Sequence, residues 1–180
     1  LPIWLDKNIN SKFSNCKIIH PGTDCESDND EYGISKREAA DYIINHGSVT
    51  KIIKTSIIGP ELNSESSLFE WFLNNKEKTI QGYNSFLWNG NTTLQWSKIC
   101  NDLVLEWDGY DVLTIPFTDC ISKFELLSII KKIYKVKIEI KKNNSVKANK
   151  CLKGNINSPS IKIQLENLKK TINNKNYNQF

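Results

Sequence analysis

A phenol and an ammonium separated by one helical turn are the groups in this 180-residue chain best suited to acid–base chemistry. They belong to Tyr32 and Lys36, which share a helix face because positions i and i+4 lie above one another. A phenol has a reference pKa of about 10, and a fixed cation nearby lowers that pKa by favouring the phenolate. The pair is therefore predicted to transfer protons. The same spacing also occurs where a surface tyrosine packs on a lysine stem, so the pair alone leaves both interpretations open.

A hydroxyl and a carboxylate lie just upstream, at the end of a predicted strand. Residues 16–20 read as a short buried strand, which runs into a turn over residues 21–25 that carries Thr23 and Asp24. In α/β folds, functional sites form at the carboxyl ends of parallel strands. We therefore expect the Thr23 hydroxyl to come within direct or one-water reach of the Tyr32 hydroxyl.

Together these segments resemble the active-site segment of the extended short-chain dehydrogenase/reductases, in particular the dTDP-4-dehydrorhamnose reductase-like branch. That branch has a Thr-Asp pair at the end of a strand and a Tyr-Gly-x-Ser-Lys sequence opening the next helix. Here these are Thr23–Asp24 and Tyr32–Lys36. Further similar blocks follow in the family's order, at residues 55–62, 67–73, 88–94 and 121–127. The resemblance covers most of residues 1 to about 170.

The resemblance implies an oxidoreductase that uses NADP or NAD to reduce a 4-keto-6-deoxy nucleotide sugar, as in dTDP-rhamnose and polysaccharide biosynthesis. Tyr32 would donate a proton to the forming alkoxide, and the Thr23 hydroxyl would hydrogen-bond the oxyanion. Lys36 would hold the nicotinamide ribose and depress the pKa of Tyr32. Ser56 is a further candidate for cofactor binding. The candidates for substrate binding are Asp24, Trp88, Asn89, Thr92 and Thr93. The last four also suit a turn followed by a helix cap.

The expected fold class is α/β. Residues 1–58 are predicted to form the second half of a doubly wound Rossmann-type parallel sheet, residues 59–170 mainly a smaller mixed α/β lobe that binds the nucleotide sugar, and residues 171–180 a frayed tail. The helix that carries Tyr32 should run over residues 30–46, start at a cap on Asp28 or Asp30, and bury Ala39, Ala40, Ile43 and Ile44. Other helices are predicted over residues 1–14, 68–74, 93–104, 123–134 and 161–172. Strands are predicted over residues 49–58, 79–83, 86–88, 111–116 and 136–140.

Several features depart from the resembled family. The sequence has no Gly-x-x-Gly-x-x-Gly turn after an early strand, although such a turn holds the pyrophosphate of a dinucleotide. Because residues 1–5 also read as the middle of a helix, we expect a fragment without the N-terminal dinucleotide-binding half, inactive alone. The loop over residues 26–31 is shorter than the family's, and Lys54 stands where the family often has arginine. The alternative function is therefore a non-catalytic binding or regulatory homologue of the same fold.

Charge and composition narrow the remaining classes. A hydrophobic content of 39% supports a folded domain, and no apolar run approaches a membrane span, so the protein is predicted to be cytoplasmic with no membrane partner. Residues 123–180 hold 14 lysines against 3 acidic residues. Arg37 is the single arginine, which disfavours a nucleic-acid partner, because arginine is the usual reader of base edges and phosphates.

The 5 cysteines are odd in number and show no Cys-x-x-Cys spacing, so we expect buried reduced thiols and no disulfide framework. A metal site that joins Cys16, His20, Asp24 and Cys25 is disfavoured, because neighbours on a strand point to opposite faces. A homodimer is compatible with the sequence. The sequence leaves open the sugar, the choice between NADH and NADPH, the oligomeric state, and whether the short loop after Cys25 abolishes catalysis.

Overall fold

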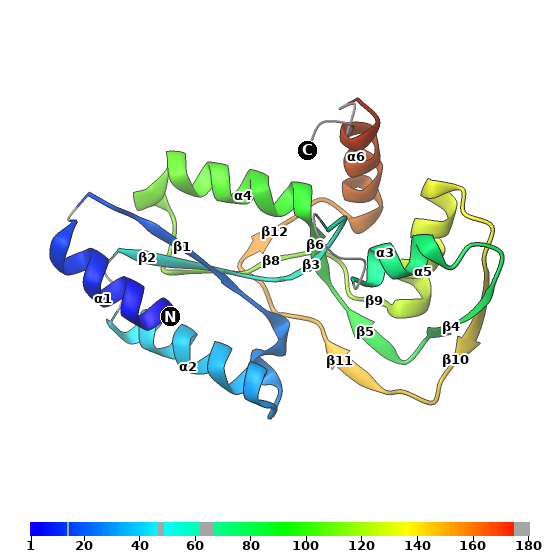
Figure 1. The fold of residues 1–180 in the computed structure, drawn as a ribbon, viewed down its shortest axis with the longest axis horizontal. Coiled ribbons are helices and arrows are strands. Elements are labelled where there is room, and N and C mark those ends of the chain that lie inside the picture. Colours follow the sequence, from blue (N-terminus) through cyan, green and yellow to red (C-terminus); the bar gives the residue numbers. More distant parts are fainter. Residues whose placement is uncertain (14, 47–48, 62–66, 175–180) are drawn as a thin grey trace. The chain divides into compact units, whose positions relative to one another are not determined.

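The computed structural model describes all residues except 14, 47–48, 62–66 and 175–180, and it has the expected α/β fold (Figure 1). The chain divides into two compact units. Unit 1 contains Leu1–Ser56, Lys98–Phe117 and Leu152–Asn157, and unit 2 contains Ile57–Ser97, Thr118–Cys151 and Ser158–Phe180. The predicted boundary after residue 58 lies close to the first passage between the units. Residues 59–170 are not one continuous lobe, however, because the chain returns twice to unit 1.

Unit 1 is built on a parallel sheet with the strand order β1-β2-β7. β1 (Ile18–Gly22) pairs with β2 (Thr50–Lys54), which in turn pairs with β7 (Leu113–Thr114). α1 (Pro2–Lys12) and α2 (Glu31–His46) lie on one side of these strands, and α4 lies on the other (Figure 1). Helices on both faces of a parallel sheet are the doubly wound arrangement that the sequence predicted. The remaining elements of the unit are η1 (Asp24–Ser27), η2 (Trp107–Gly109), β8 (Pro116–Phe117) and β12 (Ile156–Asn157).

The face of α2 that meets the sheet is narrower than its sequence suggests. Ala40 and Ile43 are buried in a small apolar cluster with Ile52 of β2. Ile44 was predicted to join them, but its side chain is 43% exposed. Adjacent positions on a helix are rotated by about 100°, so Ile44 lies at the solvent edge of the face that Ala40 and Ile43 define. The tyrosine-bearing first turn of α2 is thus positioned by a short apolar stripe farther along the helix.

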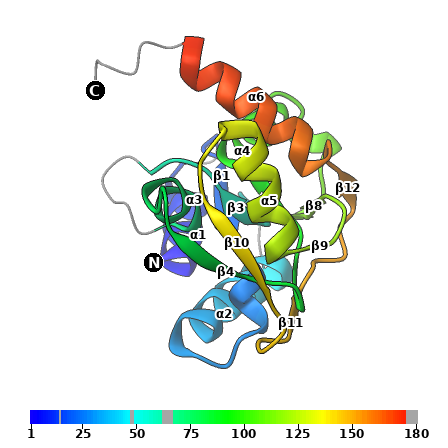
Figure 2. The same ribbon diagram turned by 90° about the vertical axis from the view of Figure 1, so that its right-hand side faces the viewer.

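Unit 2 combines short sheets with helices. α5 packs on the parallel pair β4–β10 and against α6 (Figure 2). A second sheet has the order β11-β5-β9, and β3 pairs with β6. The elements are β3 (Ser56–Ile58), α3 (Leu68–Asn74), β4 (Thr79–Tyr83), β5 (Phe86–Trp88), β6 (Gly90–Thr92), α4 (Thr93–Leu105), β9 (Ile121–Ser122), α5 (Lys123–Tyr134), β10 (Glu139–Asn143), β11 (Ala148–Lys150) and α6 (Ile161–Asn174). β3 and α4 each continue from one unit into the other.

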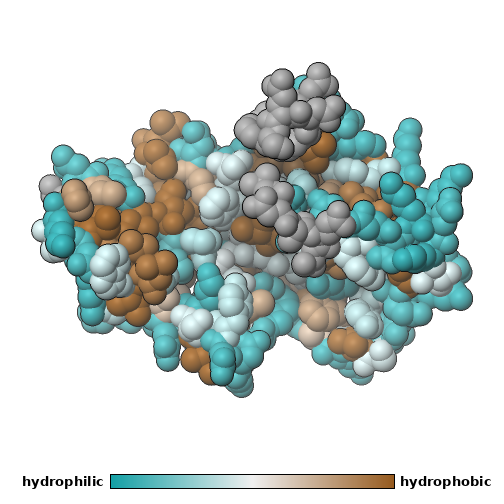
Figure 3. All heavy atoms as spheres, viewed as in Figure 1, coloured by the Kyte–Doolittle hydropathy of each residue, from teal (hydrophilic) through white to brown (hydrophobic). Residues whose placement is uncertain are grey.

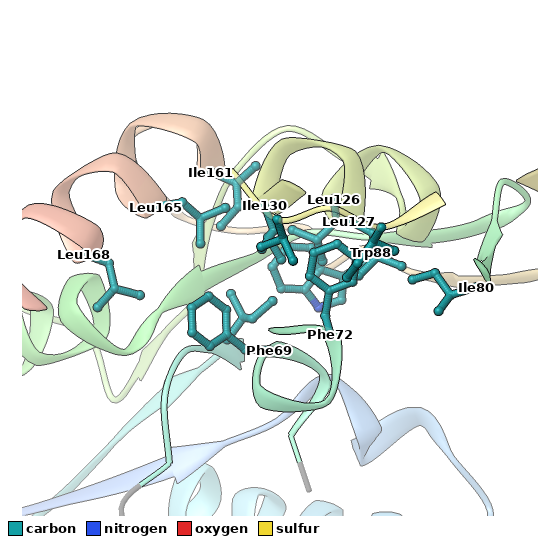
Figure 4. Packing of buried hydrophobic residues seen from close by; sticks show 13 residues of the cluster. Phe69, Phe72, Ile80, Trp88, Leu126, Leu127, Ile130, Ile161, Leu165 and Leu168 are labelled. Atoms are coloured by element: carbon teal, nitrogen blue, oxygen red, sulfur yellow. The ribbon is translucent and has the colours of Figure 1, made fainter. Parts of the chain in front are cut away.

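The core of unit 2 is the larger apolar cluster of the chain part that the structure describes. Phe69 and Phe72 of α3 meet Leu126 and Ile130 of α5, with Trp88 of β5 beside them (Figure 4). All five side chains are at most 4% exposed. The Ser122 hydroxyl caps α5 by accepting a hydrogen bond from the Glu125 N–H (3.1 Å). The Glu125 carboxylate in turn accepts a hydrogen bond from the Ser122 N–H (2.8 Å). This capping box explains why the sequence located the start of α5 correctly.

Four predicted strands differ from the observed ones. β1 begins two residues later than the strand expected over residues 16–20, and the strand expected over residues 111–116 is divided into β7, which pairs with β2, and β8, which pairs with β12. The strand expected over residues 49–58 is divided, because β2 pairs with β1 and β7 whereas β3 pairs with β6. The strand expected over residues 136–140 forms later, as β10 over Glu139–Asn143, and its first residue pairs with Thr79. Val136 and Ile138 are buried in the core ahead of the paired segment. The alternation of apolar residues here therefore indicates that these side chains are buried, and it does not indicate that this segment pairs with another strand.

The cysteines correct a further expectation. Cys120 and Cys151 form a disulfide within unit 2, with their Cα atoms 5.8 Å apart. Cys16, which was expected to be buried, is exposed, whereas Cys25 and Cys100 are half-buried free thiols. No local sequence pattern indicates this bridge, because its two cysteines are 31 residues apart.

The surface in Figure 3 shows hydrophilic side chains over the part of unit 2 that contains α5 and β10. This agrees with the excess of lysine in the second half of the sequence. Large apolar side chains are exposed on α1 and at the end of α4, among them Trp4, Val104 and Leu105. Within the described residues, no helix is both long and apolar enough to cross a bilayer.

Candidate active site

Thr23 is placed by the turn that ends β1. It caps the short helix η1: its hydroxyl accepts a hydrogen bond from the Cys25 N–H (3.2 Å), while its own N–H donates to Glu26 Oε1 (3.1 Å). This reciprocal capping box fixes both the backbone and the side chain of Thr23. The hydroxyl also donates to Asp24 Oδ1 (3.2 Å). The threonine is thus held in one orientation at the carboxyl end of the parallel sheet.

Tyr32 and Lys36 share a face of α2, as the helical spacing predicts. Asp30 caps this helix by accepting a hydrogen bond from the Gly33 N–H (2.7 Å), so the first turn that carries Tyr32 is well formed. Lys36 Nζ lies 5.7 Å from the centroid of the Tyr32 ring and donates to Pro21 O (3.4 Å). Tyr32 is 54% exposed, and Thr23, Asp24 and Cys25 of the turn lie close enough to its phenol to influence the pKa of that group. The structure therefore brings Thr23, Tyr32 and Lys36 together within unit 1.

The pKa of Tyr32 is shifted in the direction opposite to the expected one. Burial raises it, and the nearby Cys25 and Asp24 raise it further, whereas the hydrogen bond with Thr23 opposes the shift. The expected lowering of the Tyr32 pKa is therefore wrong, because burial, the largest cause, raises that pKa together with Cys25 and Asp24. A raised pKa keeps the phenol protonated at neutral pH. Tyr32 is consequently held in the form that can donate a proton.

The loop between Cys25 and Tyr32 is compact. Arg37 of α2 donates from Nη1 to Glu26 O (2.8 Å) and to Asp28 O (3.2 Å). Gly33 lets α2 approach this loop, because a Cβ at position 33 would lie 2.8 Å from Asp28 O and overlap Cys25 O. The shortness of the loop, which raised doubt about the distance from Thr23 to Tyr32, does not separate the two hydroxyls.

Gly33→Ala is expected to destabilise the protein by about 1–3 kcal/mol, the range for forcing extra atoms into a packed contact. The obstructing atoms are backbone oxygens, which can yield only if α2 or η1 moves. Urea denaturation should show this loss. Gly109→Ala is the matched control, since nothing lies within 4 Å of a Cβ at that position. Equal stability of Gly33→Ala and the original protein would show that the close approach is not required.

A buried histidine lies behind the site. His20 of β1 is 6% exposed, and its Nε2 has no hydrogen-bond partner among the described residues. Burial lowers its pKa, the positive charge of Lys36 lowers it further, and Glu26 acts in the opposite direction. His20 is therefore neutral in the folded protein near pH 7. Within the described part of the chain, no group of three or more His, Cys, Asp or Glu side chains could hold a metal ion.

Acid should destabilise the protein through His20. The folded state disfavours the protonated ring, so this contribution to the free energy of unfolding is intact above the ordinary pKa of 6.5 and is lost as the pH falls below that value. Urea denaturation at several pH values should give a steeper acid-side loss for the original protein than for His20→Gln. His46→Gln, at the exposed end of α2, should retain the original slope. Identical slopes for all three proteins would contradict this assignment.

The other two predicted site residues of unit 1, Asp24 and Ser56, have different surroundings. Asp24 accepts the Thr23 hydroxyl hydrogen bond and lies close enough to Tyr32 to raise the phenol pKa. Ser56 is the first residue of β3 and is half-buried, and its carbonyl accepts a hydrogen bond from the Thr55 hydroxyl (3.2 Å). Substrate binding by Asp24 and cofactor binding by Ser56 stay predictions.

Trp88 and Asn89 are interior residues of unit 2. Trp88 is 4% exposed and belongs to the main apolar core, and Asn89 is buried with its amide donating to Thr118 O (3.3 Å). A fully packed tryptophan can shape a pocket from behind but presents little surface to a ligand. The contacts of Trp88 and Asn89 are structural ones, as the alternative interpretation of these residues expects.

Thr92 and Thr93 have structural contacts of the same kind. The Thr92 hydroxyl caps α4 by accepting from the Gln95 N–H (3.2 Å), and its own N–H donates to Gln164 Oε1 (2.8 Å). Thr93 is half-buried and lies against Gly59, where a Cβ would overlap its hydroxyl. Substrate binding by these residues stays a prediction.

Sequence reasoning missed three residues that organise the site. Glu26 is 5% exposed and forms an ion pair with Lys54 (2.6 Å), and Arg37 fastens the loop to α2. The spacing of Thr23 and Glu26 matches the capping-box pattern, a signal that could have located Glu26. No local pattern links Glu26 to Lys54, because their meeting depends on the pairing of β1 with β2.

No family model matches the sequence, and no curated protein is significantly similar to it. Solved structures are similar in fold at low identity. A dTDP-4-dehydrorhamnose reductase from Bacillus anthracis, solved with NADP, superposes with a TM-score of 0.74 at 15% identity, over 91% of this chain and 68% of that one. A dTDP-4-dehydrorhamnose reductase from Clostridium acetobutylicum gives 0.69 at 12% identity, over 96% and 71%.

Enzymes with other reactions share this fold. The dTDP-glucose 4,6-dehydratase from Bacillus anthracis, solved with NAD, gives a TM-score of 0.68 at 12% identity, over 98% of this chain and 68% of that one. A UDP-glucose 4-epimerase from Thermotoga maritima is also similar, with a TM-score of 0.66 at 14% identity, over 96% and 68%. The chain thus has the same fold as these solved dTDP-4-dehydrorhamnose reductases, this dTDP-glucose 4,6-dehydratase and this UDP-glucose 4-epimerase.

Proposed function

We propose that the protein reduces the 4-keto group of a 6-deoxy nucleotide sugar with NADPH or NADH. The observation that supports this most strongly is the meeting of Thr23, Tyr32 and Lys36 at the carboxyl end of the parallel sheet. The fold is shared with reductases, dehydratases and epimerases, so it does not by itself select among these reactions. A phenol that stays protonated at neutral pH is compatible with donation of a proton during reduction.

Tyr32 would donate its proton to the oxygen of the former ketone as negative charge develops there. Thr23 would hydrogen-bond the same oxygen, and its orientation is already set by the capping box. The nearby Lys36 ammonium would stabilise the phenolate left after transfer. In this proposal, both hydroxyls would act on one reacting oxygen.

The nicotinamide cofactor supplies the hydride when it is bound. One reductase with this fold was solved with NADP and one dehydratase with NAD, and we propose that residues of this chain bind the same kind of group. Lys36 Nζ makes one long hydrogen bond to Pro21 O (3.4 Å), and an ammonium has three donors, which leaves two for ribose hydroxyls. The 180 residues hold no glycine-rich turn for a pyrophosphate, so activity should be measured on the protein expressed from its complete reading frame.

The test is an assay of reduced-nicotinamide consumption with a dTDP-linked 4-keto-6-deoxy sugar. The proposal expects consumption that depends on the sugar nucleotide, with one product per nicotinamide oxidised. Binding of the sugar nucleotide without turnover, seen by calorimetry, would instead assign the protein to the class of non-catalytic binding homologues.

A further inference from the structure

The carboxylate of Glu26 is the buried charge closest in sequence to the proposed catalytic hydroxyls, and the mechanism above does not use it. Its Oε2 lies 2.6 Å from Lys54 Nζ, and its Oε1 accepts the N–H of Thr23 at 3.1 Å. The Glu26 side chain is only 5% exposed, and that of Lys54 is 22% exposed. One carboxylate therefore joins the last residue of β2 to the residue that follows β1.

The main chain of the same residue is held from a third element. Arg37 of α2 donates to Glu26 O at 2.8 Å and to Asp28 O at 3.2 Å. The turn that carries Thr23 is thus attached to β2 through the Glu26 side chain and to α2 through its backbone. Since α2 also carries Tyr32, these contacts determine how the two hydroxyls meet.

A buried ion pair is a costly way to gain stability, because the desolvation of both charges offsets most of their attraction. Such a pair can instead select one geometry, since removal of either partner leaves an uncompensated charge. Here the pair would fix the position of the Thr23 backbone, because the Thr23 N–H donates a hydrogen bond to the same Glu26 carboxylate. Movement of the Thr23 backbone relative to Glu26 would break this hydrogen bond.

We propose that Glu26, neutralised by Lys54, is a positioning residue that holds the Thr23 hydroxyl against the Tyr32 hydroxyl. Its consequence for turnover rests on the proposed function, whereas the positioning itself does not. Lys54 contributes the positive charge from the end of β2, where it pairs with the last residue of β1. Loss of the pair should let the Thr23 turn move relative to α2, which changes the influence of the Thr23 hydroxyl on Tyr32 and misplaces both hydroxyls relative to the reacting oxygen.

Three variants separate positioning from folding. Glu26→Gln keeps the side-chain shape and an oxygen for the Thr23 N–H but removes the charge that Lys54 holds. Lys54→Arg keeps the charge and should retain function. The double variant Glu26→Gln/Lys54→Met removes both charges, so that no unpaired charge is left buried, and is the variant expected to fold if a single change does not. Glu38→Gln, on the exposed face of α2, is the matched control for loss of one carboxylate.

The first readout does not depend on activity. NMR titration of ring-labelled tyrosine, with the Tyr32 signal assigned by its absence in Tyr32→Phe, reports the Tyr32 pKa. The Thr23 hydroxyl lowers that pKa, so Glu26→Gln and the double variant should raise it, as Thr23→Val should. Glu38→Gln and Lys54→Arg should leave it near the original value. In a Thr23→Val background, Glu26→Gln should cause no further rise. An unchanged Tyr32 pKa in both folded variants, or a rise that persists without the Thr23 hydroxyl, would overturn the proposal.

The second readout is turnover by the protein from its complete reading frame. Misplacement of a reacting group by about an ångström costs on the order of a hundredfold. Glu26→Gln should therefore lower kcat by about tenfold to a hundredfold with little change in KM. Lys54→Met should also lower kcat, whereas Lys54→Arg should retain most of the original kcat. Full additivity with Thr23→Val would contradict positioning through Thr23. If the original protein has no turnover, the proposed function fails, and the titration alone decides the positioning.

Discussion

Tyr32→Phe is expected to lower kcat for reduction of the 4-keto nucleotide sugar by about 10²- to 10⁴-fold, the usual contribution of a positioned proton donor. The change removes only the hydroxyl, and the ring is 54% exposed, so folding should be little affected. Substrate binding should be nearly intact, because the lost proton transfer is felt mainly in the transition state. The measurement is steady-state kinetics together with calorimetric binding of the sugar nucleotide.

Tyr42→Phe is the matched control, since it removes a phenol hydroxyl from the same helix. Tyr42 stacks on His46 at the far end of α2, away from Thr23. Its kinetics should equal those of the original protein. If Tyr32→Phe also retained full turnover, the proton would come from another group and the role assigned to Tyr32 would be wrong.

Loss of the disulfide between Cys120 and Cys151 is expected to lower the free energy of unfolding by about 3 to 4 kcal/mol, the loop-closure value for a loop of this length. The two cysteines are 31 residues apart, and the segment between them contains α5, which supplies Leu126 and Ile130 to the core of unit 2. Opening the bridge gives this segment more freedom in the unfolded chain. Urea denaturation of Cys120→Ser/Cys151→Ser should show the loss.

Reductant provides an internal check on this prediction. It should destabilise the original protein by a similar amount and leave the double variant unchanged. Cys16→Ser, at an exposed free thiol, should behave as the original protein does with and without reductant. Equal stability of oxidised and reduced protein would show that the bridge does not constrain unit 2.

Helix positions were predictable from local signals. α3 and α5 occupy the predicted residues, because Ser67 and Ser122 cap them through their side chains and an apolar stripe follows each cap. Strand pairing was less accessible. The segment 136–140 has the alternation of a strand, yet its first residues pack into the core, and pairing with β4 begins only at Glu139. Pairing depends on a partner far away in the sequence, which no local pattern specifies.

In the candidate site, too, the features set by local sequence could be predicted and those set by long-range contacts could not. Thr23, Tyr32 and Lys36 could be placed together because one strand end and one helical turn determine their positions. The direction of the Tyr32 pKa could not be predicted, because it depends first on burial of the phenol and then on the approach of Cys25 and Asp24 from the turn. The contact between Glu26 and Lys54 likewise appears only once β1 and β2 are paired.

Transfer of deuterium tests the central claim most directly. The complete protein would be incubated with nicotinamide cofactor deuterated at both C4 positions and a dTDP-linked 4-keto-6-deoxy sugar, and the product analysed by mass spectrometry and NMR. We expect a product that carries one deuterium, located on carbon 4 of the sugar, and far less of it with Tyr32→Phe. Tight binding of both ligands with no deuterium in the sugar would contradict the assignment as a reductase.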